Sequence, residues 1–168
     1  MDDTGDIELL IVGDGPEKEE LEDRYAGSNI RFLGNQTGTK VLELMSKSMY
    51  LVVPSIWYEG FPMTIVEAYS VGTPVLCSRI GSLQEIVLEG VTGFQFAHGD
   101  TGNMANVMGQ AMNYGEYPRL RVAVKERYNA FYTEEVNFIA LSHIYDEVIK
   151  EKDHENRFAL QYGENYKL

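Results

Sequence analysis

Short apolar runs, each ended by glycine or proline, recur along the N-terminal part of the chain and constrain its fold more than any other feature. Residues 7–12 are rich in branched aliphatic side chains and stop at Gly13, and residues 30–33 stop at Gly34. Uninterrupted apolar runs of this length are typical of strands buried on both faces of a parallel sheet. Runs of similar character cover residues 50–55, 74–78 and, more weakly, 94–96.

Segments with helical patterning separate these runs. In residues 39–47, Val41, Leu44 and Met45 fall on one face of a helix. Parallel strands need crossover connections, which are usually helices. The alternation therefore predicts an α/β fold, with one Rossmann-like parallel sheet and helices on both faces. The other helices predicted in this part of the chain cover residues 17–24, 62–70 and 83–88.

From Asn103 onward the pattern changes to helices alone. Two apolar stripes recur at helical spacing, and we expect both to pack in the core. The periodicity ends after Lys152, which predicts one domain over residues 1–152 and a tail or final helix over 153–168. The first stripe is Met104, Val107, Met108, Ala111 and Met112, and the second is Val136, Ile139, Ala140, His143, Ile144 and Val148.

The charge and the cysteine content exclude several classes of protein. The chain has 168 residues, a formal net charge of −12 and no basic cluster, so it is expected to repel nucleic acids and anionic membranes. A single cysteine, Cys77, forms no internal disulfide and is expected to be an inert core residue. No secretory signal or apolar run long enough to cross a bilayer is present, so we expect a cytoplasmic protein.

The segment from Glu59 to Ala68 carries the clearest chemical pattern. It reads Glu-Gly-Phe-Pro-Met-Thr-Ile-Val-Glu-Ala and directly follows the predicted strand that ends at Ser55. Pro62 suits the first position of a helix, because its missing N–H is not needed there. The free amides of Met63 and Thr64 are then expected to face the carboxyl edge of the sheet, where backbone N–H groups and the helix dipole favour a phosphate.

Two carboxylates flank this helix start. Glu59 lies in the loop before the helix, and Glu67 lies about a turn and a half into it. A carboxylate is repelled by a diphosphate, but its two oxygens can accept hydrogen bonds from neighbouring hydroxyl groups. Sugars and ribose both carry such hydroxyl pairs.

In these residues the sequence resembles the family 4 retaining glycosyltransferases of the GT-B fold, whose signature is a glutamate, seven residues and a second glutamate. The resemblance covers roughly residues 7–150 and implies that the chain is one half of a GT-B glycosyltransferase, with residues 1–152 as its nucleotide-sugar-binding domain. Matching residues outside the signature are Gly13-Asp14-Gly15-Pro16, Phe32-Leu33-Gly34, Pro54-Ser55, Gly72-Thr73-Pro74-Val75, Gly81, Glu85-Ile86-Val87 and Gly93.

The resemblance also implies roles for the site residues. Glu67 would hold the ribose of a nucleotide-diphosphate sugar, and Glu59 would be the catalytic residue that contacts the transferred sugar. The family needs no metal, no protein nucleophile and no cofactor besides this donor substrate. The residues expected to line the diphosphate and the sugar are Gly60, Phe61, Pro62, Met63 and Thr64.

The chain departs from the family at its start. The family has an earlier strand ending in Gly-Arg, followed by Lys-Gly, and an N-terminal acceptor domain, and this chain contains none of them. We therefore expect weak donor binding and no transfer by this chain alone. The alternatives are a noncatalytic nucleotide-sugar-binding subunit of a split transferase and a sugar-nucleotide epimerase of similar fold. The base, the sugar, the acceptor and any membrane association stay open.

Because the last helix of the family crosses back to the N-terminal domain, we also expect an exposed apolar patch on the C-terminal helices. Its candidates are Tyr145, Val148, Ile149, Phe158, Tyr162 and Tyr166.

Other candidate residues have simpler interpretations. The three histidines, His98, His143 and His154, show no metal-ligand spacing, and His143 is expected to be a core histidine. Arg79 follows the predicted strand at residues 74–78, so it is either a phosphate contact at the ligand edge or an ordinary surface arginine.

Overall fold

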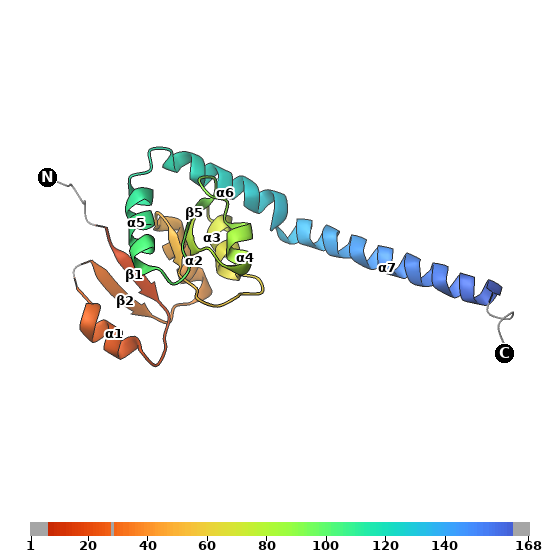
Figure 1. The fold of residues 1–168 in the computed structure, drawn as a ribbon, viewed down its shortest axis with the longest axis horizontal. Coiled ribbons are helices and arrows are strands. Elements are labelled where there is room, and N and C mark those ends of the chain that lie inside the picture. Colours follow the sequence, from red (N-terminus) through yellow and green to blue (C-terminus); the bar gives the residue numbers. More distant parts are fainter. Residues whose placement is uncertain (1–6, 28, 163–168) are drawn as a thin grey trace.

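The structure is a computed structural model that describes residues 7–27 and 29–162, with side chains described as far as Lys152. Its strands alternate with helices up to residue 96, and only helices follow (Figure 1). The strands are β1 (Leu9–Val12), β2 (Ile30–Gly34), β3 (Leu51–Val53), β4 (Val75–Ser78) and β5 (Gly93–Phe96). The helices are α1 (Lys18–Tyr25), α2 (Gly38–Lys47), α3 (Met63–Ser70), α4 (Gly81–Ile86), α5 (Thr101–Met112), α6 (Tyr117–Phe131) and α7 (Glu134–Tyr162).

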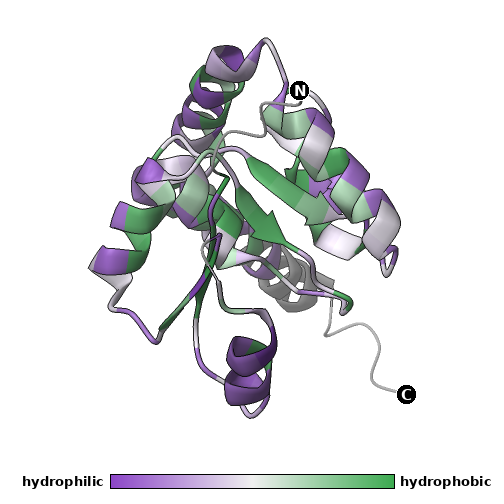
Figure 2. Ribbon diagram, turned by 90° about the vertical axis from the view of Figure 1, so that its left-hand side faces the viewer, coloured by the Kyte–Doolittle hydropathy of each residue, from purple (hydrophilic) through white to green (hydrophobic). Residues whose placement is uncertain are grey.

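The core is built on the parallel sheet β3–β4–β5, with β4 in the middle. Val75 and Cys77 of β4 pack with α2, α3 and α4, whereas Leu76 points the other way and packs with Tyr50, Phe96 and α5. Every residue of β4 is buried, and Figure 2 shows apolar strands between helices whose polar sides face outward. The predicted α/β fold with helices on both faces of a parallel sheet is confirmed.

The prediction of one continuous sheet is wrong for this chain. β1 and β2 form a separate parallel pair that is not hydrogen-bonded to the β3–β4–β5 sheet. Leu9, Ile11 and Val12 of β1 are each more than a third exposed, and α1 buries no residue. Successive strand residues point to opposite faces, so neither face of β1 is fully covered. Apolar patterning identified β1 as a strand, but the described chain supplies no strand to join it to β3.

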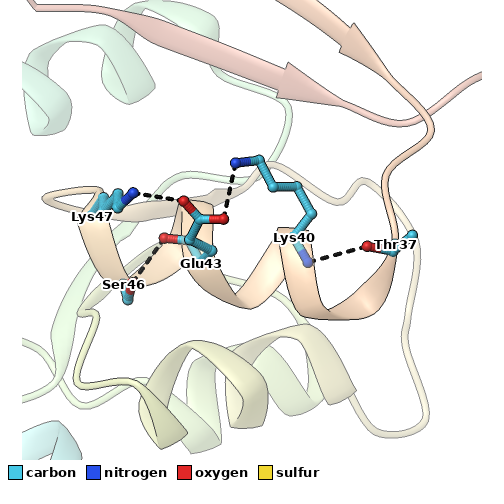
Figure 3. Close-up of polar contacts among 5 residues, drawn as sticks. All are labelled: Thr37, Lys40, Glu43, Ser46 and Lys47. Atoms are coloured by element: carbon cyan, nitrogen blue, oxygen red, sulfur yellow. Dashed lines mark hydrogen bonds and ion pairs between the residues drawn. The ribbon is translucent and has the colours of Figure 1, made fainter.

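Helix α2 shows how polar side chains support an element whose other face is buried. Thr37 is the N-cap and accepts a hydrogen bond from the Lys40 amide at 3.3 Å (Figure 3). Met45 of the same helix lies in the core. Glu43 accepts from Lys40 at 2.9 Å and from Lys47 at 2.6 Å, and these contacts lower the pKa of its carboxyl to about 2. Because the three groups are exposed to solvent, the ion pairs orient the surface of α2 more than they stabilise it.

The two apolar stripes of the helical part differ in burial. In α5, Ala111 is buried and the four methionine and valine side chains of the stripe pack against the core, as predicted. The second stripe lies in α7, and the prediction that it packs in the core is wrong. Ile139 and Ile144 are more than half exposed, because α7 extends away from the rest of the molecule (Figure 1). The exposed patch expected at Tyr145, Val148 and Ile149 is confirmed, since each is more than half exposed.

His143 is likewise an exposed side chain of α7, within 3.6 Å of Glu147, and not a core histidine. The backbone helix continues past 152 to 162, where the sequence predicted a tail or a final helix. In the described part of the chain, none of the helices combines the length and apolar character that crossing a bilayer requires. His154, Phe158, Tyr162 and residues 163–168, which include Tyr166, lie outside the described side chains.

The close approach of β5 to β4 predicts a severe effect of one glycine substitution. A Cβ on Gly93 would lie 1.8 Å from the Val75 carbonyl oxygen, so the two strands would have to separate. We expect Gly93→Ala to lower the free energy of unfolding by about 2–4 kcal/mol in urea titrations. The matched control is Gly109→Ala in α5, where a Cβ meets nothing within 4 Å and helix propensity adds up to about 1 kcal/mol. Equal midpoints for both variants would contradict the packing described here.

Burial of β4 predicts that its thiol is unreactive. Cys77 is fully buried, and loss of solvent raises the pKa of its thiol to about 12. The native protein should therefore react with iodoacetamide at pH 8 only through unfolding, whereas the unfolded chain in urea should react like a free thiol. Mass spectrometry of timed samples checks this. Rapid labelling under native conditions would show that β4 is not the centre of the core.

Candidate functional site

The carboxyl ends of β3, β4 and β5 bring three connecting segments to one edge of the sheet. Because the strands are parallel, the loop after β3, the turn after β4 and the segment after β5 leave the sheet on the same side. This is the edge at which open α/β sheets bind ligands. Glu59 lies in the loop after β3, and Glu67 lies in α3, which that loop enters.

The loop that carries Glu59 is held at three points. The Ser55 hydroxyl donates to Glu59 Oε1, and the Ser82 hydroxyl donates to the Glu59 carbonyl oxygen at 2.8 Å. His98 Nε2 lies 3.0 Å from the Ile56 carbonyl oxygen. A carbonyl oxygen can only accept, so this contact requires the ring proton on Nε2. Glu59 is half-buried in this arrangement, with one carboxylate oxygen engaged.

The start of α3 is open to solvent. The helix begins at Met63, with Pro62 as the N-cap and not the first helical residue, which corrects the sequence prediction by one position. Pro62 offers no side-chain cap, and the first backbone bond across this end runs from the Ile65 amide to the Pro62 carbonyl oxygen at 3.0 Å. The amides of Met63 and Thr64 precede any intrahelical acceptor, and both residues are exposed. The expected pair of free donors is present.

Glu67 differs from Glu59 in its surroundings. It is half-buried on α3, and within the described part of the chain its carboxylate makes no hydrogen bond or ion pair. Two positions further on, Tyr69 is fully buried and donates to Thr92 Oγ1 at 2.7 Å, which ties the opposite face of α3 to the core. The helix therefore holds Glu67 at its partly exposed side with both oxygens free to accept.

A cavity of about 350 Å³ opens at the same edge of the sheet. It is lined by Ile56, Tyr58, Arg79 and His98 among others, and none of residues 59–64 lines it. Phe61 and Met63 are more than half exposed, beside this cavity and outside its lining. The roles expected for residues 59–64 around a diphosphate and a sugar stay predictions.

Three of these supporting residues were not identified from the sequence as parts of the site. Ser55 belongs to a Pro-Ser pair whose position after a strand was the available signal. Ser82 and His98 carried none, since they follow β4 and β5 and reach the β3 loop only across the sheet edge. Within the described residues, no group of three or more His, Cys, Asp or Glu side chains is arranged to hold a metal ion.

A family model described as "Glycosyl transferases group 1" matches residues 1–113 of the chain. Among curated proteins, the N-acetyl-alpha-D-glucosaminyl L-malate synthase of Bacillus anthracis is 31% identical over 136 residues, which cover 74% of this chain and 34% of that protein. Sulfoquinovosyl transferase SQD2 of Arabidopsis thaliana is 34% identical over 103 residues, which cover 60% of this chain and 20% of that protein. The chain thus spans between 20% and 34% of the length of these relatives.

Solved structures have the same fold. Sucrose-phosphate synthase from Thermosynechococcus elongatus superposes with a TM-score of 0.75 at 26% identity, covering 86% of this chain and 39% of that one. Anabaena HepE in complex with UDP-glucose superposes with a TM-score of 0.71 at 21% identity, covering 83% of this chain and 41% of that one. The second likeness is one of fold alone.

Because the Ser82 hydroxyl binds the Glu59 carbonyl oxygen, we expect Ser82 to restrain the loop that carries Glu59. Removing a hydrogen bond of this kind costs about 0.5–1.5 kcal/mol, so Ser82→Ala should raise the open population of the loop roughly three- to tenfold. Cleavage by chymotrypsin after Trp57 and Tyr58, which are 75% and 83% exposed, should accelerate by a similar factor. The control is Ser46→Ala on α2, which also removes a 2.8 Å bond to a carbonyl oxygen. Identical cleavage rates in both variants would show that Ser82 does not restrain the loop.

Proposed function

The chain belongs to the group 1 glycosyl transferases, with the fold of one half of a GT-B enzyme, and we propose that it binds the nucleotide-diphosphate sugar from which such an enzyme transfers a glycosyl group with retention. The observation that carries the proposal is the start of α3, where the Met63 and Thr64 amides lie uncapped between two carboxylates. Backbone donors at a helix start suit a diphosphate, and carboxylates suit the hydroxyl groups on either side of it. In support, HepE has been solved with UDP-glucose bound.

In this proposal the two glutamates bind different parts of the donor. Glu67 has both oxygens free and lies within α3, so it accepts hydrogen bonds from the ribose hydroxyls. Glu59 keeps one oxygen bonded to Ser55 and lies in the loop before the helix, so it faces the transferred sugar, where positive charge develops as the bond to the diphosphate breaks. Gly60 and Phe61, with Pro62, Met63 and Thr64, surround the diphosphate.

We propose further that the complete catalytic unit contains segments that this chain lacks. The chain spans only part of its relatives, and β1 is a strand of apolar residues with neither face fully covered. An additional strand bearing cations, together with an acceptor domain, would cover β1 and neutralise the leaving diphosphate. The chain alone is then a weak donor binder without transfer activity. The acceptor and the cytoplasmic location stay predictions.

The proposal is tested by calorimetry on the chain with the diphosphates of uridine, guanosine and adenosine. One of them should bind, and Glu67→Ala should weaken that binding by about tenfold or more, since a charge-assisted hydrogen bond is worth about 1.5–3 kcal/mol. Glu59→Ala should leave the free nucleotide unaffected, because that ligand has no sugar beyond the diphosphate. It should instead weaken the matching nucleotide-sugar and, once the missing half is restored, lower turnover.

The matched control is Glu126→Ala on the exposed side of α6, which removes the same charge far from the sheet edge. It should change neither affinity. If none of the three nucleotides binds at millimolar concentration, the donor-binding proposal fails. If Glu59→Ala and Glu67→Ala weaken the free nucleotide equally, the division between ribose and sugar is wrong.

A further inference from the structure

The cavity beside the Glu59 loop is a second polar site at the sheet edge. Its volume of about 350 Å³ lies within the range of roughly 300–1,000 Å³ found for small-molecule sites. Its walls come from the segments that follow three different strands, namely Tyr58 after β3, Arg79 after β4 and His98 after β5. Neither Glu67 nor the start of α3 contributes to it, so it is separate from the proposed donor site.

Arg79 is held in place on this wall by a fixed amide. Its Nε donates to Gln95 Oε1 at 3.3 Å. Gln95 Nε2 in turn donates to the carbonyl oxygens of Gln84 and Val87, at 3.1 and 2.6 Å, so the amide cannot turn its oxygen away from Arg79 without losing both bonds. The neighbouring carboxylate of Glu89 accepts a hydrogen bond from the backbone N–H of Gln95 at 2.8 Å.

No carboxylate neutralises this arginine. Within the described residues Arg79 forms no ion pair, and only its Nε has a hydrogen-bond acceptor, so both terminal nitrogens of the guanidinium are free. Such a fork matches the two oxygens of a carboxylate or a phosphate. Arg79 is an exposed residue, so an anion can reach these two nitrogens from solvent.

The other walls suit the ring of a sugar. Tyr58 is 83% exposed and its ring lies against Gly81, where a Cβ would come within 3.0 Å of Tyr58 Cδ1. Gly81 therefore leaves room for the ring beside the turn, and the exposed ring can pack against an apolar surface of a ligand. His98 uses Nε2 on the Ile56 carbonyl oxygen, which leaves Nδ1 as a second polar group on the wall.

We propose that this cavity binds a monosaccharide carrying an anionic group, with the carboxylate or phosphate on Arg79 and the sugar ring against Tyr58. The cavity lies next to the loop that holds Glu59, so under the proposed function its ligand occupies a second subsite beside the transferred sugar. Only this relation to the transfer rests on the proposed function. The binding of an anionic sugar rests on the cavity itself.

The test uses the full chain saturated with the nucleoside diphosphate that it binds, so that the donor site is filled, or without nucleotide if none binds. Glucose 6-phosphate, glucuronate, inorganic phosphate and neutral glucose are titrated, and binding is followed by amide chemical shifts around the cavity. Both charged sugars should bind at the cavity, and glucose should bind at least tenfold more weakly. The two charged sugars distinguish a phosphate from a carboxylate ligand.

Variants then assign the contacts. Arg79→Gln should weaken both charged sugars at least tenfold, and Arg79→Lys should weaken them less. Arg119→Gln is the matched control, because it removes the same charge from an exposed residue of α6 that pairs with Glu116. Tyr58→Ala should weaken glucose 6-phosphate while leaving inorganic phosphate unchanged.

Two outcomes overturn the inference. The first is that neither charged sugar binds at the cavity at about 20 mM, a concentration that corresponds to roughly 2 kcal/mol of binding free energy. The second is that Arg119→Gln weakens binding as much as Arg79→Gln does. Nucleotide binding with no sugar binding leaves the proposed function intact. Sugar binding that depends on Arg79, with no nucleotide binding, supports the cavity and removes its link to a transferase.

Discussion

Burial of β4 on both faces is the constraint on which the rest of the structure depends. Its alternate side chains belong to two different clusters, Val75 and Cys77 on one side and Leu76 on the other. A strand of this kind is stable only when helices cover both faces and strands flank both edges. The positions of α2, α3 and α4 on one face and α5 on the other, and the pairing with β3 and β5, follow from this requirement.

The site exists because that sheet is parallel. Its strands end at one edge, and segments far apart in sequence meet there, as the bonds from Ser82 to Glu59 and from His98 to Ile56 show. The core thus fixes α3 through Tyr69 on its inner side and presents Glu67 on its outer side. At this edge, Ser82 and His98 hold the loop after β3 by hydrogen bonds to backbone carbonyl oxygens.

Two parts of the chain lie outside this core and behave alike. β1 and α7 both carry apolar residues in the pattern of buried elements, yet Ile11 and Val148 are exposed. In the described residues, the neighbours of these elements, β2 and α6, leave these side chains exposed. Exposed apolar patches tend to mark sites of contact with other polypeptide.

Local patterning was sufficient to predict the strands and helices, the parallel pairing, the burial of Cys77 and the open helix start beyond Glu59. Each depends on neighbours in sequence, through strand and helix periodicity, the position of proline and the need for crossover helices. The break between β1 and β3, the exposure of His143 and Ile144, and the anchoring of Glu59 by Ser82 could not be predicted in this way. They were decided by which elements the chain has available to pack together, because an apolar stripe specifies that a face needs covering but not what covers it.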